Sequence, residues 1–144
     1  MIEVTGDLWE YSADVRVITT NGDVNRFGRA VMSRGVALQA KQRYRDLDVV
    51  LAQDLEQHGL RVAVLPFDVV PPIVVFPVKY HWHQKANLKL IARSARELVK
   101  LIESHTTVVM PRPGCGNGGL NWEDVKPVIA PILKSRRFVI IERG

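Results

Sequence analysis

The stretch Thr106–Asp124, TTVVMPRPGCGNGGLNWED, decides how the chain is expected to fold. A β-branched, apolar run ends at Pro111, and a turn with four glycines in six residues follows at Gly114–Gly119. Glycines permit backbone conformations and close approaches that other residues forbid. Backbone amides freed at such a turn, beside a helix N-terminus, form a site for phosphate. The stretch therefore predicts a strand, a ligand-binding loop and a helix that starts near Trp122.

The composition is that of one globular domain. The chain has 144 residues, of which 47% are hydrophobic and 24% charged. Glu3 and Asp7 interrupt the opening residues, so we expect no signal peptide, and no apolar run reaches the roughly 18 residues of a membrane span. The single cysteine, Cys115, excludes an internal disulfide and favours the cytoplasm. An excess of five basic residues is compatible with a polyanionic partner such as DNA or RNA, but many small domains are mildly basic.

Strands and helices are expected to alternate along the chain. Strands are expected at 2–5, 15–19, 61–65, 73–78, 106–110 and 138–142, and helices at 30–44, 46–57, 87–104 and about 122–134, with a brief helical turn at 7–11. Pro127 and Pro131 disturb the last helix, because a restart near Lys126 accommodates the first proline but not the second. Apolar strands separated by helices predict a single three-layer α/β/α domain over residues 1–144.

Four polar features directly follow predicted strands. They are Gly6-Asp7, Asn21, Lys79 and the glycine loop. Ligands bind such sheets outside the carboxyl ends of the strands, so one cleft is expected to collect all four. Lys79 is either a solvated strand end, or a charge clamp or nucleophilic amine, since the pKa of a lysine falls readily on desolvation. Asp7 is either a helix cap or an acceptor for the amine of a base.

Three further patterns are weaker. The spacing Gly114-x-Gly116-x-x-Gly119, with Glu142 beyond it, matches a dinucleotide fingerprint, but only one strand remains after it, which disfavours a Rossmann dehydrogenase. Cys115 lies beside a helix start that can stabilise a thiolate, yet no partner histidine is evident, so a structural cysteine is favoured. His81 and His83 have metal-like spacing without a third ligand, so we expect no metal.

Four segments together resemble the macro domain, an ADP-ribose-binding fold. They are VTGDL (4–8), TNG (20–22), VMSRGVALQ (31–39) and GCGNGGLNW (114–122). The last two, with Phe76-Pro77-x-Lys79-x-x-Trp82, are similar to the branch that holds the DNA ADP-ribosyl glycohydrolase antitoxins (DarG) and the terminal ADP-ribose protein glycohydrolases. The resemblance runs from Ile2 to about Glu142. It implies a macro-domain-like fold with a central mixed, mostly parallel sheet of about six strands.

The resemblance also implies roles for the matching residues. Lys79 matches the lysine held to be catalytic in this branch, and Asp7 would accept the adenine amine. The amides of the glycine loop would cradle the diphosphate, while Asn21 and the 32–35 segment would surround the distal ribose. The implied ligand-binding residues are Asp7, Leu8, Thr20, Asn21, Met32, Ser33, Arg34, Gly35, Val36, Pro113, Gly114, Cys115, Gly116, Asn117, Gly118, Gly119 and Leu120.

Departures from the branch pattern bear on the substrate. The protein-directed enzymes carry a catalytic aspartate in the glycine loop, and the corresponding residue here is Gly118, as in the DNA-directed antitoxins. This difference favours ADP-ribose linked to DNA. Ser33-Arg34 stands where the motif usually has Gly-Lys, and the Gly22–Arg29 loop is longer than in the antitoxins. We also expect no room in 144 residues for the further domain with which the antitoxins neutralise a toxin.

The combined expectation is an ADP-ribosyl glycohydrolase that removes ADP-ribose from DNA bases. It would need no cofactor or metal, would not bind a membrane, and would act as a cytoplasmic monomer. An ADP-ribosyltransferase would be its functional counterpart. Two alternatives stay open: a module that binds ADP-ribose or a related nucleotide without turnover, and a hydrolase of a small ADP-ribose derivative or of protein-linked ADP-ribose.

Overall fold

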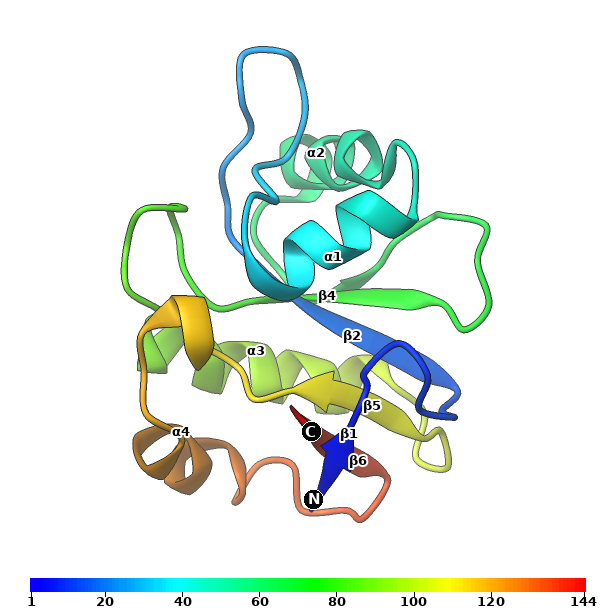
Figure 1. Cartoon of the computed structure of the whole chain (residues 1–144), viewed down its shortest axis with the longest axis vertical. Helices are drawn as coiled ribbons and strands as arrows, with labels where there is room; N and C mark the ends of the chain where they lie inside the picture. Colours follow the sequence, from blue (N-terminus) through cyan, green and yellow to red (C-terminus); the bar gives the residue numbers. More distant parts are fainter.

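A six-stranded sheet forms the centre of the computed structural model, which describes all 144 residues (Figure 1). Its strands lie in the order β1-β6-β5-β2-β4-β3, and all neighbours are parallel except β3, which is antiparallel to β4. The strands are β1 (Ile2–Gly6), β2 (Val15–Thr20), β3 (Ala63–Val64), β4 (Ile73–Pro77), β5 (Val108–Pro111) and β6 (Phe138–Arg143). The helices are α1 (Gly35–Arg43), α2 (Leu47–His58), α3 (Leu88–Leu101) and α4 (Trp122–Ile129), with a short 3₁₀ turn η1 (Gly116–Gly118).

Helices cover both faces of this sheet (Figure 1). Successive side chains of a strand point to opposite faces, and β4 shows the alternation clearly. Ile73 and Val75 pack into the core beneath α1 and α2, whereas Val74 and Phe76 pack into the core with α3 and α4. The three-layer α/β/α architecture and the mixed, mostly parallel sheet are therefore confirmed. None of the helices combines the length and the apolar character that a membrane crossing requires.

On one face of the sheet, β1, β6 and β5 are covered by the segment that follows β1. Leu8, in the segment after β1, is buried against Val109, Val139 and Ile141 in a small separate cluster. The buried guanidinium of Arg16 on β2 donates to the backbone carbonyls of Leu8 and Tyr11. Burial lowers the pKa of Arg16, and its hydrogen bonds hold the 8–11 segment against the sheet. This segment lies where the helical turn was expected, but it forms turns instead.

Two expected helices differ from the structure. The helix expected at 30–44 starts only at Gly35, because the preceding residues are extended: Ala30 bridges Val24 and Arg34 has φ −148°. The helix expected to reach 134 ends at Ile129, so Pro131 lies beyond it. Pro127 stays inside an unbroken α4 rather than at a restart.

The expected strand at 61–65 shortens to the two residues of β3. The other strands and helices occur where they were expected, with ends shifted by one to three residues. Such shifts at element ends are ordinary, because terminal residues make fewer ladder or helical hydrogen bonds.

Candidate functional site

A cavity of about 760 Å³ opens at the carboxyl ends of the parallel strands. The segments after β1, β2, β4 and β5 all contribute to its wall, together with the start of α1. The structure thus brings the four polar features of the sequence into one cleft. The predicted residues that line it are Asp7, Leu8, Thr20, Asn21, Ser33, Arg34, Gly35, Val36, Lys79, Gly114, Cys115, Gly116, Asn117 and Gly118.

Four predicted ligand residues lie outside the cleft wall. Met32 is 2% exposed and packs into the core under α1 and α2, because the extended 30–34 segment turns its side chain inward. Leu120 packs against the core of α3 and α4, and Pro113 is buried. A side chain at Gly119 would face Lys85 rather than the cavity.

The glycines of the 114–119 loop serve different purposes. Gly114 has φ +78°, and a Cβ there would lie 2.7 Å from Cδ1 of Ile91, so the loop packs directly on α3. A Cβ at Gly118 would lie 3.0 Å from Cβ of Ala86. Gly116 has φ +74° with open space around its Cβ position. Two of these glycines therefore permit close packing, and only Gly116 presents an open position at the cavity.

The start of α1 faces the glycine loop across the cleft. Gly35 has φ +57°, and a Cβ there would lie 3.0 Å from Nδ2 of Asn117. The first-turn amides of a helix have no partner within the helix, and the N-cap residue Arg34 makes no side-chain capping bond. These amides and the positive end of the helix dipole lie in the cleft wall, an arrangement that suits an anion.

Lys79 follows β4 and lines the cleft with a half-buried side chain. Its Nζ donates to the backbone carbonyl of Trp82 at 3.2 Å. Burial, and secondarily the charge of Arg34, hold the pKa of Lys79 below its ordinary value. A lysine with a lowered pKa supplies more of the neutral amine near pH 7, which is the form that acts as nucleophile or base.

Asp23 ties the segment after Lys79 to the loop after β2. Its Oδ1 lies 2.7 Å from Nδ1 of His81, and its Oδ2 accepts the backbone N–H of Trp82 at 2.8 Å. Burial acts to raise the pKa of Asp23, but these two hydrogen bonds hold it below its ordinary value. Gly22 permits the junction, because a Cβ there would lie 2.8 Å from the carbonyl oxygen of Tyr80. The Nδ1 of His81 is therefore occupied by its hydrogen bond to the Asp23 carboxylate.

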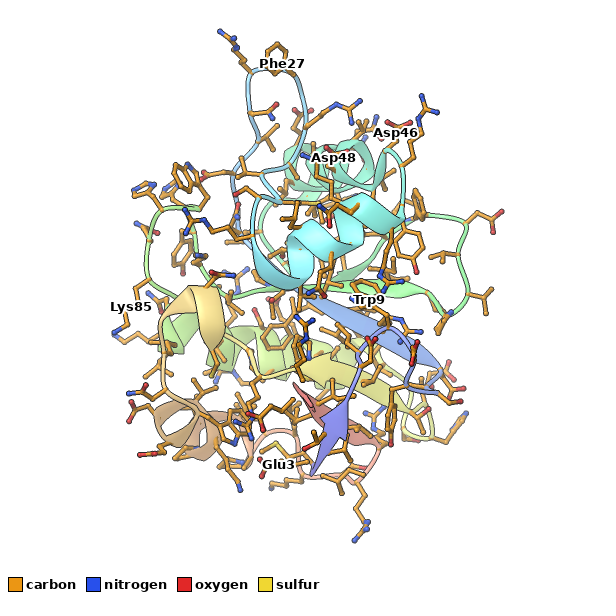
Figure 2. All side chains as sticks on the ribbon, viewed as in Figure 1. Glu3, Trp9, Phe27, Asp46, Asp48 and Lys85 are labelled. Atoms are coloured by element: carbon orange, nitrogen blue, oxygen red, sulfur yellow. The ribbon has the colours of Figure 1, made fainter.

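The opposite end of the cleft lies at Asp7. Its Oδ1 accepts the backbone N–H of Trp9 at 2.8 Å, so the carboxylate shapes its own turn. Trp9 lines the cavity, donates from Nε1 to Oε1 of Gln39 at 2.8 Å and lies 4.7 Å beneath the guanidinium of Arg43. Figure 2 labels Trp9 next to α1. Sequence reasoning missed these three wall residues, although Gln39 and Arg43 share a helix face and Trp9 follows Asp7 closely.

The cleft wall is strongly basic. Its basic side chains are Arg34, Arg43, Lys79, Arg112 and Arg143, whereas Asp7 is the only acidic side chain in it.

Burial raises the pKa of the Cys115 thiol, so this cysteine is a neutral group at pH 7, in agreement with a structural role. Glu142 pairs with Arg112 at 3.1 Å and does not line the cavity, which removes the ribose-binding acid of the dinucleotide hypothesis.

Comparisons with known proteins point to one family. The model of the family described as Macro domain matches residues 61–129. The chain is 31% identical over 130 residues to the DNA ADP-ribosyl glycohydrolase of Mycobacterium tuberculosis, an alignment that covers 85% of this chain and 35% of that protein. It is also 31% identical over 94 residues to a DNA ADP-ribosyl transferase–DNA ADP-ribosyl glycohydrolase fusion protein of Thermosipho africanus. This alignment covers 64% of this chain and 23% of that protein. The chain spans about a third or less of the length of these relatives.

Solved structures agree with this result. The macrodomain of Mycobacterium tuberculosis DarG superposes with a TM-score of 0.82 at 27% identity, covering 99% of this chain and 97% of that one. Thermosipho africanus DarTG in complex with ADP-ribose superposes with a TM-score of 0.81 at 23% identity, covering 99% of this chain and 42% of that one. The chain is thus similar to macrodomains along its whole length.

Proposed function

We propose that this chain is a macro domain whose cleft binds ADP-ribose and hydrolyses the bond between ADP-ribose and a DNA base. The observation that carries the proposal is a half-buried Lys79 with a lowered pKa at one end of a basic cleft that can accept a diphosphate. Two kinds of comparison support it: relatives named DNA ADP-ribosyl glycohydrolase, and a DarTG structure in complex with ADP-ribose.

ADP-ribose would lie along the cleft from Asp7 to Lys79. The free oxygen of the Asp7 carboxylate would accept the adenine amine, and the indole of Trp9 offers an apolar wall beside it. The diphosphate would lie between the first turn of α1 and the glycine loop, where open space at Gly116 allows close approach to the backbone. The distal ribose would then lie between Asn21, the 33–35 segment and Lys79.

Lys79 is the group best suited to the chemistry. Hydrolysis breaks the bond between the anomeric carbon and the base, adds the hydroxyl of water to that carbon and returns a proton to the base. The neutral amine of Lys79 can attack the carbon of the opened sugar, and its protonated form can stabilise charge on the departing base. Position 118 carries no carboxylate, and the Cys115 thiol has a raised pKa, so the glycine loop offers no competing acid or base.

The biological setting follows from the same chemistry. A fusion relative combines a DNA ADP-ribosyl transferase with a glycohydrolase, and we infer that this chain reverses the product of such a transferase. The single cysteine fits a reducing cytoplasm, where DNA is accessible. We infer that a monomer carries out the reaction, with the cleft wall formed by segments of one chain.

Calorimetry and a turnover assay together test the proposal. The wild-type protein is expected to bind ADP-ribose and to release it from a modified oligonucleotide. Lys79→Ala should retain binding while release falls by about 10²–10⁴-fold, the usual contribution of a positioned acid or base. Binding without release from any linkage would instead support a binding module, and release only from proteins or small esters would correct the substrate. Absence of ADP-ribose binding contradicts the proposal.

A further inference from the structure

A second, smaller cavity adjoins the cleft at Lys79. Its volume is about 200 Å³, and its wall consists of Arg34, Lys79, Trp82, His83, Gln84 and Asn117. The first three and Asn117 also line the main cavity, so the two spaces meet at the amine of Lys79. The proposed function requires two product sites that meet at the bond to be cut. The main cavity accounts for only one of them.

We propose that the second cavity holds the nucleobase that carries ADP-ribose, with its ring stacked on the indole of Trp82. This inference rests on the proposed function and specifies the other half of the substrate. The volume agrees with this assignment. A cavity of about 200 Å³ is smaller than the pockets of about 300–1,000 Å³ that hold drug-sized ligands, so it suits a ligand as small as a single planar ring. The base must then leave the stack of its own strand, as bases do in other enzymes that react on them.

Trp82 is held firmly by its backbone while its ring stays available. Its N–H donates to Asp23 at 2.8 Å, and its carbonyl accepts from Nζ of Lys79 at 3.2 Å. Trp82 is nevertheless 49% exposed and lines the second cavity, so its ring is accessible from that cavity. The ring of His83, which also lines the second cavity, meets the Trp82 ring edge-on at 5.8 Å between ring centroids. A fixed backbone with an exposed ring is a suitable platform for stacking.

The charges around the second cavity also suit a nucleotide strand. Arg34 lines it and makes no ion pair with a carboxylate, and Lys79 lines it as well. None of its six wall residues is acidic. The phosphates on either side of a bound base would therefore meet cations without repulsion. A protein carboxylate that carries ADP-ribose, by contrast, offers this second cavity neither a ring to stack nor flanking backbone phosphates to pair.

The test compares variants of Trp82 on an oligonucleotide that carries ADP-ribose on one base. Stacking of a base on an aromatic ring contributes about 1–3 kcal/mol, which corresponds to about 5- to 150-fold. Trp82→Ala should raise KM for the oligonucleotide within this range, and Trp82→Phe should restore most of the loss. Phe27→Ala is the matched control, since Phe27 is 72% exposed at the tip of the neighbouring 22–29 loop and lines neither cavity (Figure 2). This control should leave KM unchanged.

Titration of each variant with free ADP-ribose separates the two cavities. Trp82→Ala should keep most of its affinity for ADP-ribose, which also demonstrates that the variant is folded. An unchanged KM in Trp82→Ala, or an equal loss of affinity for ADP-ribose and for the oligonucleotide, would overturn the assignment of the base site while leaving the proposed function intact. A wild-type protein that neither binds ADP-ribose nor releases it would overturn the proposed function, and the base site with it.

Discussion

Replacing Gly114 by alanine tests how the glycine loop is built. A Cβ at this position would lie 2.7 Å from Cδ1 of Ile91, 3.0 Å from Cδ1 of Leu120 and 3.1 Å from Cβ of Ala86. Real Cβ atoms do not approach other heavy atoms to 2.7 Å, so α3 or the loop must move. Overpacking of this kind typically costs about 1–3 kcal/mol. The residue also has φ +78°, a conformation that costs an L-residue about 1–2 kcal/mol.

Gly116→Ala is the matched control. Gly116 has nearly the same φ, +74°, but no heavy atom lies within 4 Å of its Cβ position. The conformational strain and the gain from a stiffer unfolded chain are then the same in both variants and cancel in their difference. The free energy of unfolding should therefore be lower in Gly114→Ala than in Gly116→Ala by the overpacking cost alone, about 1–3 kcal/mol.

Urea denaturation followed by tryptophan fluorescence measures this difference, provided that the m-values of the two variants agree. Calorimetry adds a functional contrast. Gly116→Ala extends a methyl group into the open position beside the cleft and should weaken ADP-ribose binding, while unfolding at a higher urea concentration than Gly114→Ala. Equal stability of the two variants would refute the assignment of Gly114 to packing, and unchanged ADP-ribose affinity in Gly116→Ala would refute the assignment of Gly116 to the ligand.

Three further outcomes follow from the site. Arg34→Gln removes a charge that lowers the pKa of Lys79, so the Lys79-controlled limb of the kcat–pH profile should move to higher pH; an unmoved limb would contradict this coupling. Asp23→Asn should be less stable than wild type, and because the folded pKa of Asp23 is lowered, this difference should shrink below about pH 4 in denaturation experiments rather than persist. Asp7→Ala should weaken ADP-ribose binding by about tenfold in calorimetry, as expected for loss of one hydrogen bond to a charged group, whereas unchanged affinity would reassign Asp7 to its turn alone.

The layers of the fold and the location of the cleft could be predicted from the sequence. Apolar strands such as β4 reveal burial on both faces, and polar residues at the strand ends reveal where a parallel sheet places its ligand site. Helix boundaries were less predictable. Val31 and Met32 have the apolar spacing of a helix, but tertiary packing holds them in an extended segment that leads to Gly35.

Residues of the site that depend on three-dimensional contacts were beyond a sequence pattern. The role of Asp23 becomes apparent only when the loop after β2 meets His81 and Trp82, which are 58 and 59 residues away. The glycine loop illustrates the same limit. Its composition predicted backbone freedom, but only the structure distinguishes Gly114, which packs on Ile91, from Gly116, which borders open space.

The mass of a modified oligonucleotide after incubation tests the central claim most directly. The wild-type protein is expected to return a single-stranded oligonucleotide that carries ADP-ribose on one base to its unmodified mass, with intact ADP-ribose as the second product. Lys79→Ala should leave the modified mass unchanged over the same time while still binding ADP-ribose. An oligonucleotide that retains ribose phosphate would place the cut at the diphosphate, and an unchanged mass with the wild-type protein would contradict hydrolysis at the base.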